Sequence, residues 1–84
     1  MTKRDISIFI SNSTNHVLGR MVEGGLEKAE STELFFGENE QRIIEFSKYI
    51  CASGNYQVER RSTPNLDDRD NLYHTYSLIV RRNI

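Results

Sequence analysis

The sequence predicts a small α+β domain with two layers: a mostly antiparallel sheet of about four strands, with one or two helices on one face. Two observations carry this prediction. A strand–helix–strand pattern occupies residues 32–62, and segments of alternating polarity lie on both sides of it. The length of 84 residues suits one domain with one small core, so we expect residues 1–84 to fold as a single unit.

The central pattern begins with residues 33–36, a bulky run that is too short for a helix and therefore indicates a strand. Gly37 interrupts this run, and either Gly37 or Asn39 can cap the helix that follows. Gly54 is expected to end that helix, because glycine readily adopts the left-handed conformation found at helix C-termini. Alternation over residues 56–61 then predicts a second strand.

The predicted helix between these strands carries one apolar stripe. Ile43, Phe46 and Ile50 recur at spacings of three and four residues, so we expect them to face the sheet. Cys51 lies beside the stripe and is the only cysteine, which excludes an internal disulfide. We expect Cys51 to be a packed and unreactive thiol, because a cysteine at the end of an apolar helix stripe usually acts as a small hydrophobic residue.

The N-terminal part contains one clear pattern and one ambiguous pattern. Residues 5–11 read DISIFIS, and the strict alternation of isoleucine predicts a half-buried strand. Residues 16–30 fit a helix with one apolar face, but they also fit a hairpin that turns at Gly24 and Gly25. Periodicity favours the helix, since neither strand face of the hairpin would be consistently apolar.

The C-terminal part is expected to form a long loop and a last strand. Residues 62–71 contain the only proline and are predicted to be an exposed loop. Residues 72–82 alternate and are predicted to pair antiparallel with residues 56–61. The loop carries a dense acidic group: Asp67, Asp68 and Asp70.

Composition narrows the possible functions. Eleven basic and twelve acidic residues give a formal charge of −1, which argues against a general nucleic-acid or membrane-surface binder. No apolar run is long enough for a membrane span, and no secretory signal pattern is present. We therefore expect a cytoplasmic protein that does not associate with membranes.

No motif indicates catalysis, a cofactor or a metal. His16 and His74 lack the paired ligands at short spacing that metal sites use. The acidic loop lacks the central glycine and the terminal glutamate of a calcium loop. Gly24 and Gly25 lack the lysine and hydroxyl residue of a phosphate-binding loop. We expect a protein that is not an enzyme and holds no cofactor or metal.

Arginine and tyrosine residues of the last two predicted strands form the main candidate site. If the strands pair, we expect four arginines to gather at one end of the hairpin. Arginine with tyrosine can bind phosphates and stack on bases, or it can anchor a protein interface; a solvated strand end is the plainest interpretation. The candidate partner-binding residues are Arg60, Arg61, Arg81, Arg82, Tyr56, Tyr73, Asp67, Asp68 and Asp70.

A second candidate surface follows from the expected layers. If helices cover only one side of the sheet, then Phe9 and Ile79 lie on the other side. An open sheet face with large apolar side chains commonly serves association. We therefore expect self-association through Phe9 and Ile79, as a possible homodimer.

The function these observations favour is protein binding by a small regulator or inhibitor. Phages and mobile elements encode many such proteins against host enzymes, a comparison that rests on how common they are and not on particular residues. The alternative is binding of RNA or single-stranded nucleic acid through the arginine and tyrosine hairpin. A third hypothesis is a small ribonuclease-like toxin that uses His74, a tyrosine and the arginines. The sequence does not identify the partner.

Overall fold

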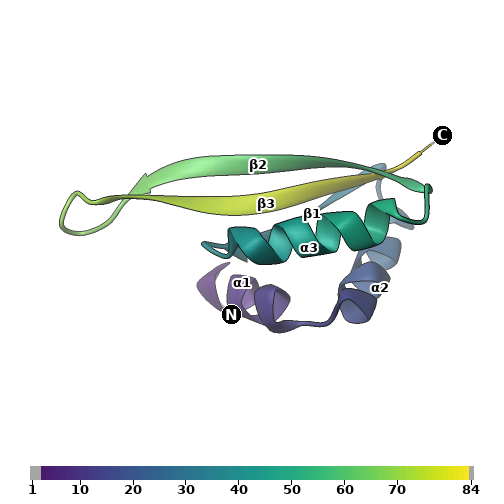
Figure 1. The fold of residues 1–84 in the computed structure, drawn as a ribbon, viewed down its shortest axis with the longest axis horizontal. Helices are drawn as coiled ribbons and strands as arrows, with labels where there is room; N and C mark the ends of the chain where they lie inside the picture. The colour runs from purple at the N-terminus through teal and green to yellow at the C-terminus, as the bar shows by residue number, and fades with distance from the viewer. Residues whose placement is uncertain (1–2, 84) are drawn as a thin grey trace.

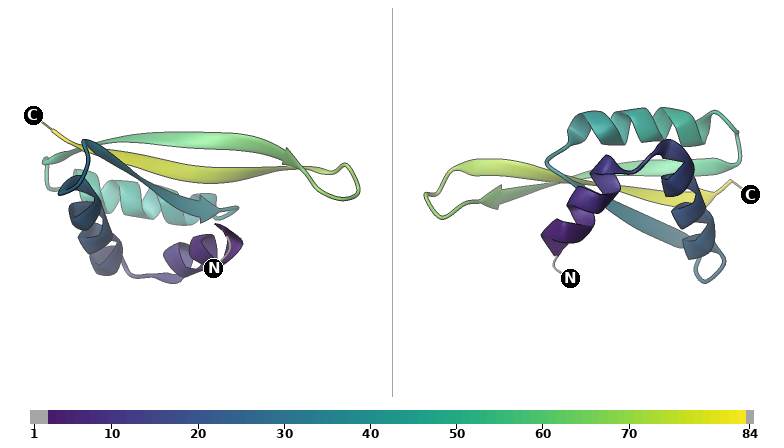
Figure 2. Two further views of the ribbon diagram at one scale, coloured as in Figure 1. Left: turned by 180° about the vertical axis from the view of Figure 1, so that it is seen from behind. Right: turned by 90° about the horizontal axis from the view of Figure 1, so that it is seen from below.

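The computed structural model describes residues 3–83, in which one three-stranded antiparallel sheet has the order β1-β3-β2. Its elements are α1 (Lys3–Asn12), α2 (Asn15–Leu26), β1 (Ser31–Gly37), α3 (Glu40–Cys51), β2 (Tyr56–Leu66) and β3 (Leu72–Arg82). All the helices lie on the same side of the sheet (Figures 1 and 2). The predicted α+β class is confirmed, but residues 3–83 form three strands and three helices where about four strands and one or two helices were expected.

Helix α3 follows its predicted pattern closely. The side chain of Asn39 accepts a hydrogen bond from the backbone N–H of Arg42 at 3.1 Å, so Asn39 is the cap. Ile43, Phe46 and Ile50 are all buried against the sheet, as predicted. The core they enter is completed by Ile10, Leu18, Val22, Leu26, Leu34, Phe36, Leu78 and Val80.

Cys51 departs from the prediction, because its thiol is exposed and not packed. It follows Ile50 directly in α3, and one residue turns a helix by about 100°. That turn carries Cys51 off the buried stripe, although the two residues are adjacent in the sequence.

The ambiguous segment is a helix, and the hairpin interpretation is wrong. Thr14 caps α2 by accepting a hydrogen bond from the N–H of Val17 at 3.2 Å. Gly25 has a packing role, since a Cβ built there would lie 2.5 Å from Oγ1 of Thr32 in β1. By contrast, a Cβ at Gly24 would meet nothing within 4 Å. Gly25 alone therefore allows the close approach of α2 to β1, and the glycine pair lies within α2 and does not form a turn.

Residues 5–11 form most of α1, so the predicted first strand is wrong. Of the alternating isoleucines only Ile10 is buried, at 2% exposure, whereas Ile6 and Ile8 are 38% and 49% exposed. Ser7 lies against Gly37, with 3.3 Å between the serine Cβ and a Cβ built on the glycine. Ser7 and Ile10 are three residues apart, and both contact the rest of the domain. A spacing of three residues is typical of one helix face and not of a strand. The alternation of isoleucines therefore does not predict which of them are buried.

The hairpin of β2 and β3 is longer than predicted. Strand β2 continues through Pro64 to Leu66, so only residues 67–71 connect the strands and the expected loop over residues 62–71 is wrong. The antiparallel pairing of the last two strands is confirmed, with Tyr56 opposite Arg82 and Leu66 opposite Leu72. Proline is tolerated here because β2 lies at the edge of the sheet.

The far part of this hairpin projects beyond the body of the molecule (Figure 1). Strand β1 ends at Gly37, opposite Tyr76 of β3, so only two strands continue past that point. We call residues 62–76 the arm. It accounts for the elongated shape of the fold, which extends 44 × 23 × 22 Å.

Candidate functional site

The tip of the arm carries an exposed apolar pair. Leu66 and Leu72 lie opposite each other in the register, and each is 64% exposed. In β3, alternation puts Leu72 on the same face as Leu78 and Val80, which the helices bury completely. The core-facing pattern of the sheet therefore continues past the helices, onto a part of the hairpin that they do not cover.

An acidic loop with internal hydrogen bonds joins the two leucines. The carboxylate of Asp67 accepts hydrogen bonds from the backbone N–H groups of Asn71 at 2.9 Å and Arg69 at 2.8 Å. These bonds to Asn71 and Arg69 lower the pKa of Asp67, because they stabilise its charged form. A backbone hydrogen bond from Asp67 to Asn71 closes the loop around residues 68–70, and Asp70 has the positive φ of 60° that is common at the last position of such a three-residue tip. Asp68 is exposed in the same loop, so the structure brings the three predicted acidic residues together at the tip.

The four predicted arginines do not gather at one end of the hairpin, so this expectation is wrong. Arg81 and Arg82 lie opposite Gln57 and Tyr56, whereas Arg60 and Arg61 lie opposite Leu78 and Ser77. The two pairs are thus about 13 Å apart along the strands. The short loop at residues 67–71 produces this register, which the expected long loop did not suggest.

The predicted arginines also have separate local partners. Arg82 contacts Glu23 of α2 with 3.0 Å between Nη2 and Oε2, and Arg61 lies 3.8 Å from Glu33 of β1. Of the two predicted tyrosines, Tyr73 lies near the tip, opposite Asn65, and Tyr56 lies at the far end of the hairpin. The candidate residues are therefore spread along the length of the hairpin.

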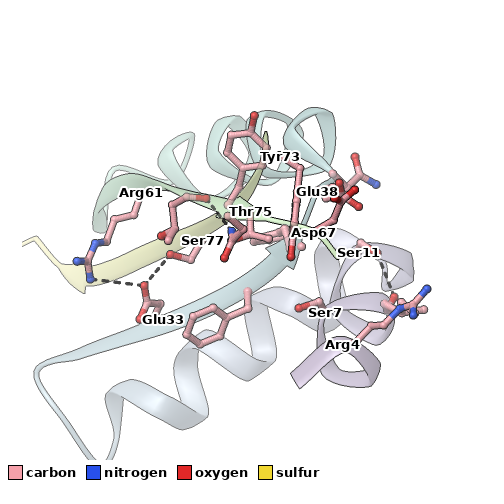
Figure 3. A pocket seen from close by; sticks show the side chains of 18 residues that line it. Arg4, Ser7, Ser11, Glu33, Glu38, Arg61, Asp67, Tyr73, Thr75 and Ser77 are labelled. Atoms are coloured by element: carbon pink, nitrogen blue, oxygen red, sulfur yellow. Dashed lines mark hydrogen bonds and ion pairs between the residues drawn. The ribbon is translucent and has the colours of Figure 1, made fainter. Parts of the chain in front are cut away.

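A groove of about 1120 Å³ opens between the arm and α1. The arm contributes hydroxyl and aromatic side chains, and α1 contributes polar side chains from the other wall (Figure 3). The residues that define the two walls are Thr63, Tyr73 and Thr75 on the arm, and Arg4, Ser7 and Ser11 on α1.

The floor of the groove contains a polar contact that the sequence did not predict. Ser77 is buried, at 6% exposure, and its hydroxyl donates a hydrogen bond of 2.6 Å to Oε2 of Glu33. Arg61 approaches the same carboxylate oxygen. Alternation within β1 was the available signal, because it places Glu33 and Phe35 on the face away from the helices. The carboxylate of Glu33 therefore has two partners at the floor of the groove, Ser77 and Arg61.

The predicted self-association residues lie on different elements. Phe9 is 57% exposed on α1 and is not part of the sheet. Ile79 is partly buried in β3, where its neighbours in the register are Glu33 and Glu59. The two side chains therefore do not share a strand face, as the predicted first strand would have required.

Two further features describe the part of the chain that the structure covers. Within residues 3–83, no group of three or more His, Cys, Asp or Glu side chains is placed to hold a metal ion. None of the helices described there has the length and apolar character needed to cross a membrane.

No protein-family model, no curated protein and no solved structure matches this chain.

Proposed function

We propose that this domain is a non-enzymatic protein-binding module, a regulator or inhibitor that contacts its partner through the tip of the arm. The observation that carries the proposal is the pair Leu66 and Leu72, each 64% exposed on a ribbon that projects from the body. Burial of one leucine side chain contributes about 1.5–3 kcal/mol, so covering this pair would be a substantial part of a binding free energy.

The loop beside the leucines gives the tip a negative charge. Asp67, Asp68 and Asp70 outnumber Arg69, and the hydrogen bonds of Asp67 hold the loop in one conformation. A fixed acidic group around an apolar centre favours a basic protein surface, because complementary charge speeds encounter and excludes wrong partners. A preformed loop also loses less conformational entropy on binding.

The nucleic-acid alternative receives less support from the same geometry. Phosphate binding through this hairpin would use its four arginines, but they are dispersed, and Arg61 and Arg82 lie next to glutamates. The acidic loop would in addition repel a phosphate backbone.

The test is capture of partners from the cell of origin by the tagged full chain, with and without nuclease. We expect nuclease-resistant protein partners for the unaltered chain and their loss for the variant Leu66→Ser/Leu72→Ser. Val17→Ser is the matched control, because it removes an exposed apolar side chain that lies on α2, outside the arm. Recovery of nucleic acid alone, or equal capture by the leucine variant, would contradict the proposal.

Self-association through Phe9 and Ile79 is tested separately. Sedimentation of the unaltered chain and of Phe9→Ser should show a dimer that the substitution weakens. A monomer at high micromolar concentration would leave Phe9 and Ile79 without a role in self-association.

A further inference from the structure

The arm has two strand edges with different neighbours. On one side, β2 is the edge strand of the sheet along its whole length. On the other side, β1 ends at Gly37 opposite Tyr76. In the part of the chain that the structure describes, residues 72–75 of β3 therefore have no strand on that side. This stretch, which we call the free β3 edge, spans about 13 Å.

The hairpin loop determines which backbone groups point out from the free β3 edge. The N–H of Asp67 donates a hydrogen bond of 3.0 Å to the C=O of Asn71, so this opposed pair is a hydrogen-bonded one. Hydrogen-bonded and non-hydrogen-bonded pairs alternate along an antiparallel ladder. Tyr73 and Thr75 therefore direct their backbone groups toward β2, whereas Leu72 and His74 direct theirs outward.

Only one of the two edges carries a feature that blocks strand addition. Pro64 in β2 lies opposite His74, at a non-hydrogen-bonded position, so the position without an N–H faces outward from β2. Natural proteins protect exposed edges with proline, lysine and other charged residues. The free β3 edge reads LYHT and contains no proline, lysine or other permanently charged residue.

The groove extends from the face of the arm across the free β3 edge to α1, because its lining includes Thr63 of β2, Tyr73 of β3 and Ser7 of α1. Its volume of about 1120 Å³ is slightly above the usual range for ligand sites, about 300–1,000 Å³. Its lining includes Tyr73 and Thr75 from this edge. An extended polypeptide placed next to β3 would thus have α1 on its other side.

The charges of the groove favour a polypeptide over a nucleic acid. Arg4 and Arg61 line it together with Glu33, Glu38 and Asp67, which gives two positive and three negative groups. Such a nearly balanced lining suits a segment of low net charge, and it lacks the positive field that a phosphate backbone needs.

We propose that the groove receives an extended segment of a partner protein, which adds to the free β3 edge as a further strand. The segment pairs with the outward backbone groups of Leu72 and His74, and main-chain hydrogen bonds supply most of its affinity. Its side chains next to Tyr73 and Thr75 are aromatic, β-branched or hydroxyl-bearing, because such cross-strand pairs are favourable. This inference rests on the proposed protein-binding function and assigns part of that binding to the groove.

The test uses the full chain and a displayed library of random peptides of about 12 residues as the probe. His74→Pro removes one outward N–H at the position opposite Pro64, where the neighbouring strand already accommodates a proline. His74→Ala is the matched control, because it removes the imidazole and keeps the N–H. We expect enriched peptides to bind the unaltered chain and His74→Ala equally, and to bind His74→Pro at least about tenfold more weakly.

Amide hydrogen exchange on the unaltered chain gives a readout that does not depend on how the proline variant folds. In the free protein, the amides of Leu72 and His74 should exchange quickly and those of Tyr73 and Thr75 slowly. Bound peptide should slow exchange at Leu72 and His74. No change at these two amides, failure of the library to enrich any peptide, or undiminished binding to His74→Pro would overturn the proposal.

The two proposals can fail separately. Peptides or partners that are lost with Leu66→Ser/Leu72→Ser but retained by His74→Pro would place the contact at the tip, and strand addition would be wrong. Partners that are retained by the leucine variant but lost with His74→Pro would support strand addition and contradict the tip as the contact.

Discussion

The two halves of the β2–β3 hairpin have the same alternating pattern but different surroundings. In the half that belongs to the body, Leu78 and Val80 are fully buried beneath the helices. In the arm, Leu72 continues the same face of β3, and Leu66 lies opposite it, yet both are 64% exposed. The helices therefore cover the apolar face of the hairpin along only part of its length. The two halves therefore differ in packing: one is covered by the helices, and the other stays exposed.

The largest expected effect is in the body. Phe46 is fully buried, and its ring centroid lies 6.3 Å from that of Phe36 and 6.2 Å from that of Tyr49. Phe46→Ala should lower the free energy of unfolding by about 3–5 kcal/mol and the melting temperature by more than about 10 °C. Thermal unfolding followed by circular dichroism measures this. A shift of only a degree or two would mean that the body does not depend on α3 for its stability.

An intermediate effect is expected where α2 meets β1. Gly25→Ala should destabilise the fold by about 1–3 kcal/mol, because the new Cβ would lie 2.5 Å from Oγ1 and 2.8 Å from Cβ of Thr32. Gly24→Ala is the matched control, since its Cβ meets no atom within 4 Å, and it should stabilise α2 by about 0.5–1 kcal/mol. Urea unfolding of both variants compares them directly. Equal effects of the two substitutions would contradict the close approach of α2 to β1.

The smallest expected effect is at the tip of the arm. Asp70 adopts a φ of 60°, a conformation that glycine reaches without the steric cost of a Cβ. Asp70→Gly should therefore stabilise the hairpin by about 0.5 kcal/mol, whereas Asp68→Gly, at a position without positive φ, should not. Precise denaturant curves can separate the two. Stabilisation by Asp68→Gly but not by Asp70→Gly would show that the loop has another conformation.

Helices α3 and α1 show what a local pattern can and cannot predict. In α3, Ile43, Phe46 and Ile50 are at helical spacing and all enter the core, so the pattern and the packing agree. In α1, isoleucine alternates as in a strand, but only Ile10 enters the core. Which of several isoleucines is buried depends on where β1 and its Gly37 lie, and no pattern within residues 5–11 contains that information.

The candidate site was only partly predictable for a similar reason. The acidic tip and the pairing of the last strands followed from composition and alternation, and both are present. The predicted arginine cluster does not form, because the positions of the arginines depend on the register of the hairpin. That register depends on a loop whose length Pro64 obscured. A proline usually ends a strand; in β2 it continues one, because the strand has a free outer edge. The groove requires α1 beside the arm, a tertiary arrangement with no local signal.

The order of strands has a consequence for how the chain acquires its structure during synthesis. Among the elements of residues 3–83, β3 comes last in the sequence, yet it lies between β1 and β2, which do not pair with each other. While residues 72–82 are still inside the ribosome, the emerged part of the chain can form helices but no sheet. The core residues of β1 and α3 then have no complete surface on which to pack. Folding should therefore be a late, concerted event, and a ribosome that stalls before β3 emerges should present chaperones with an apolar and unpaired chain.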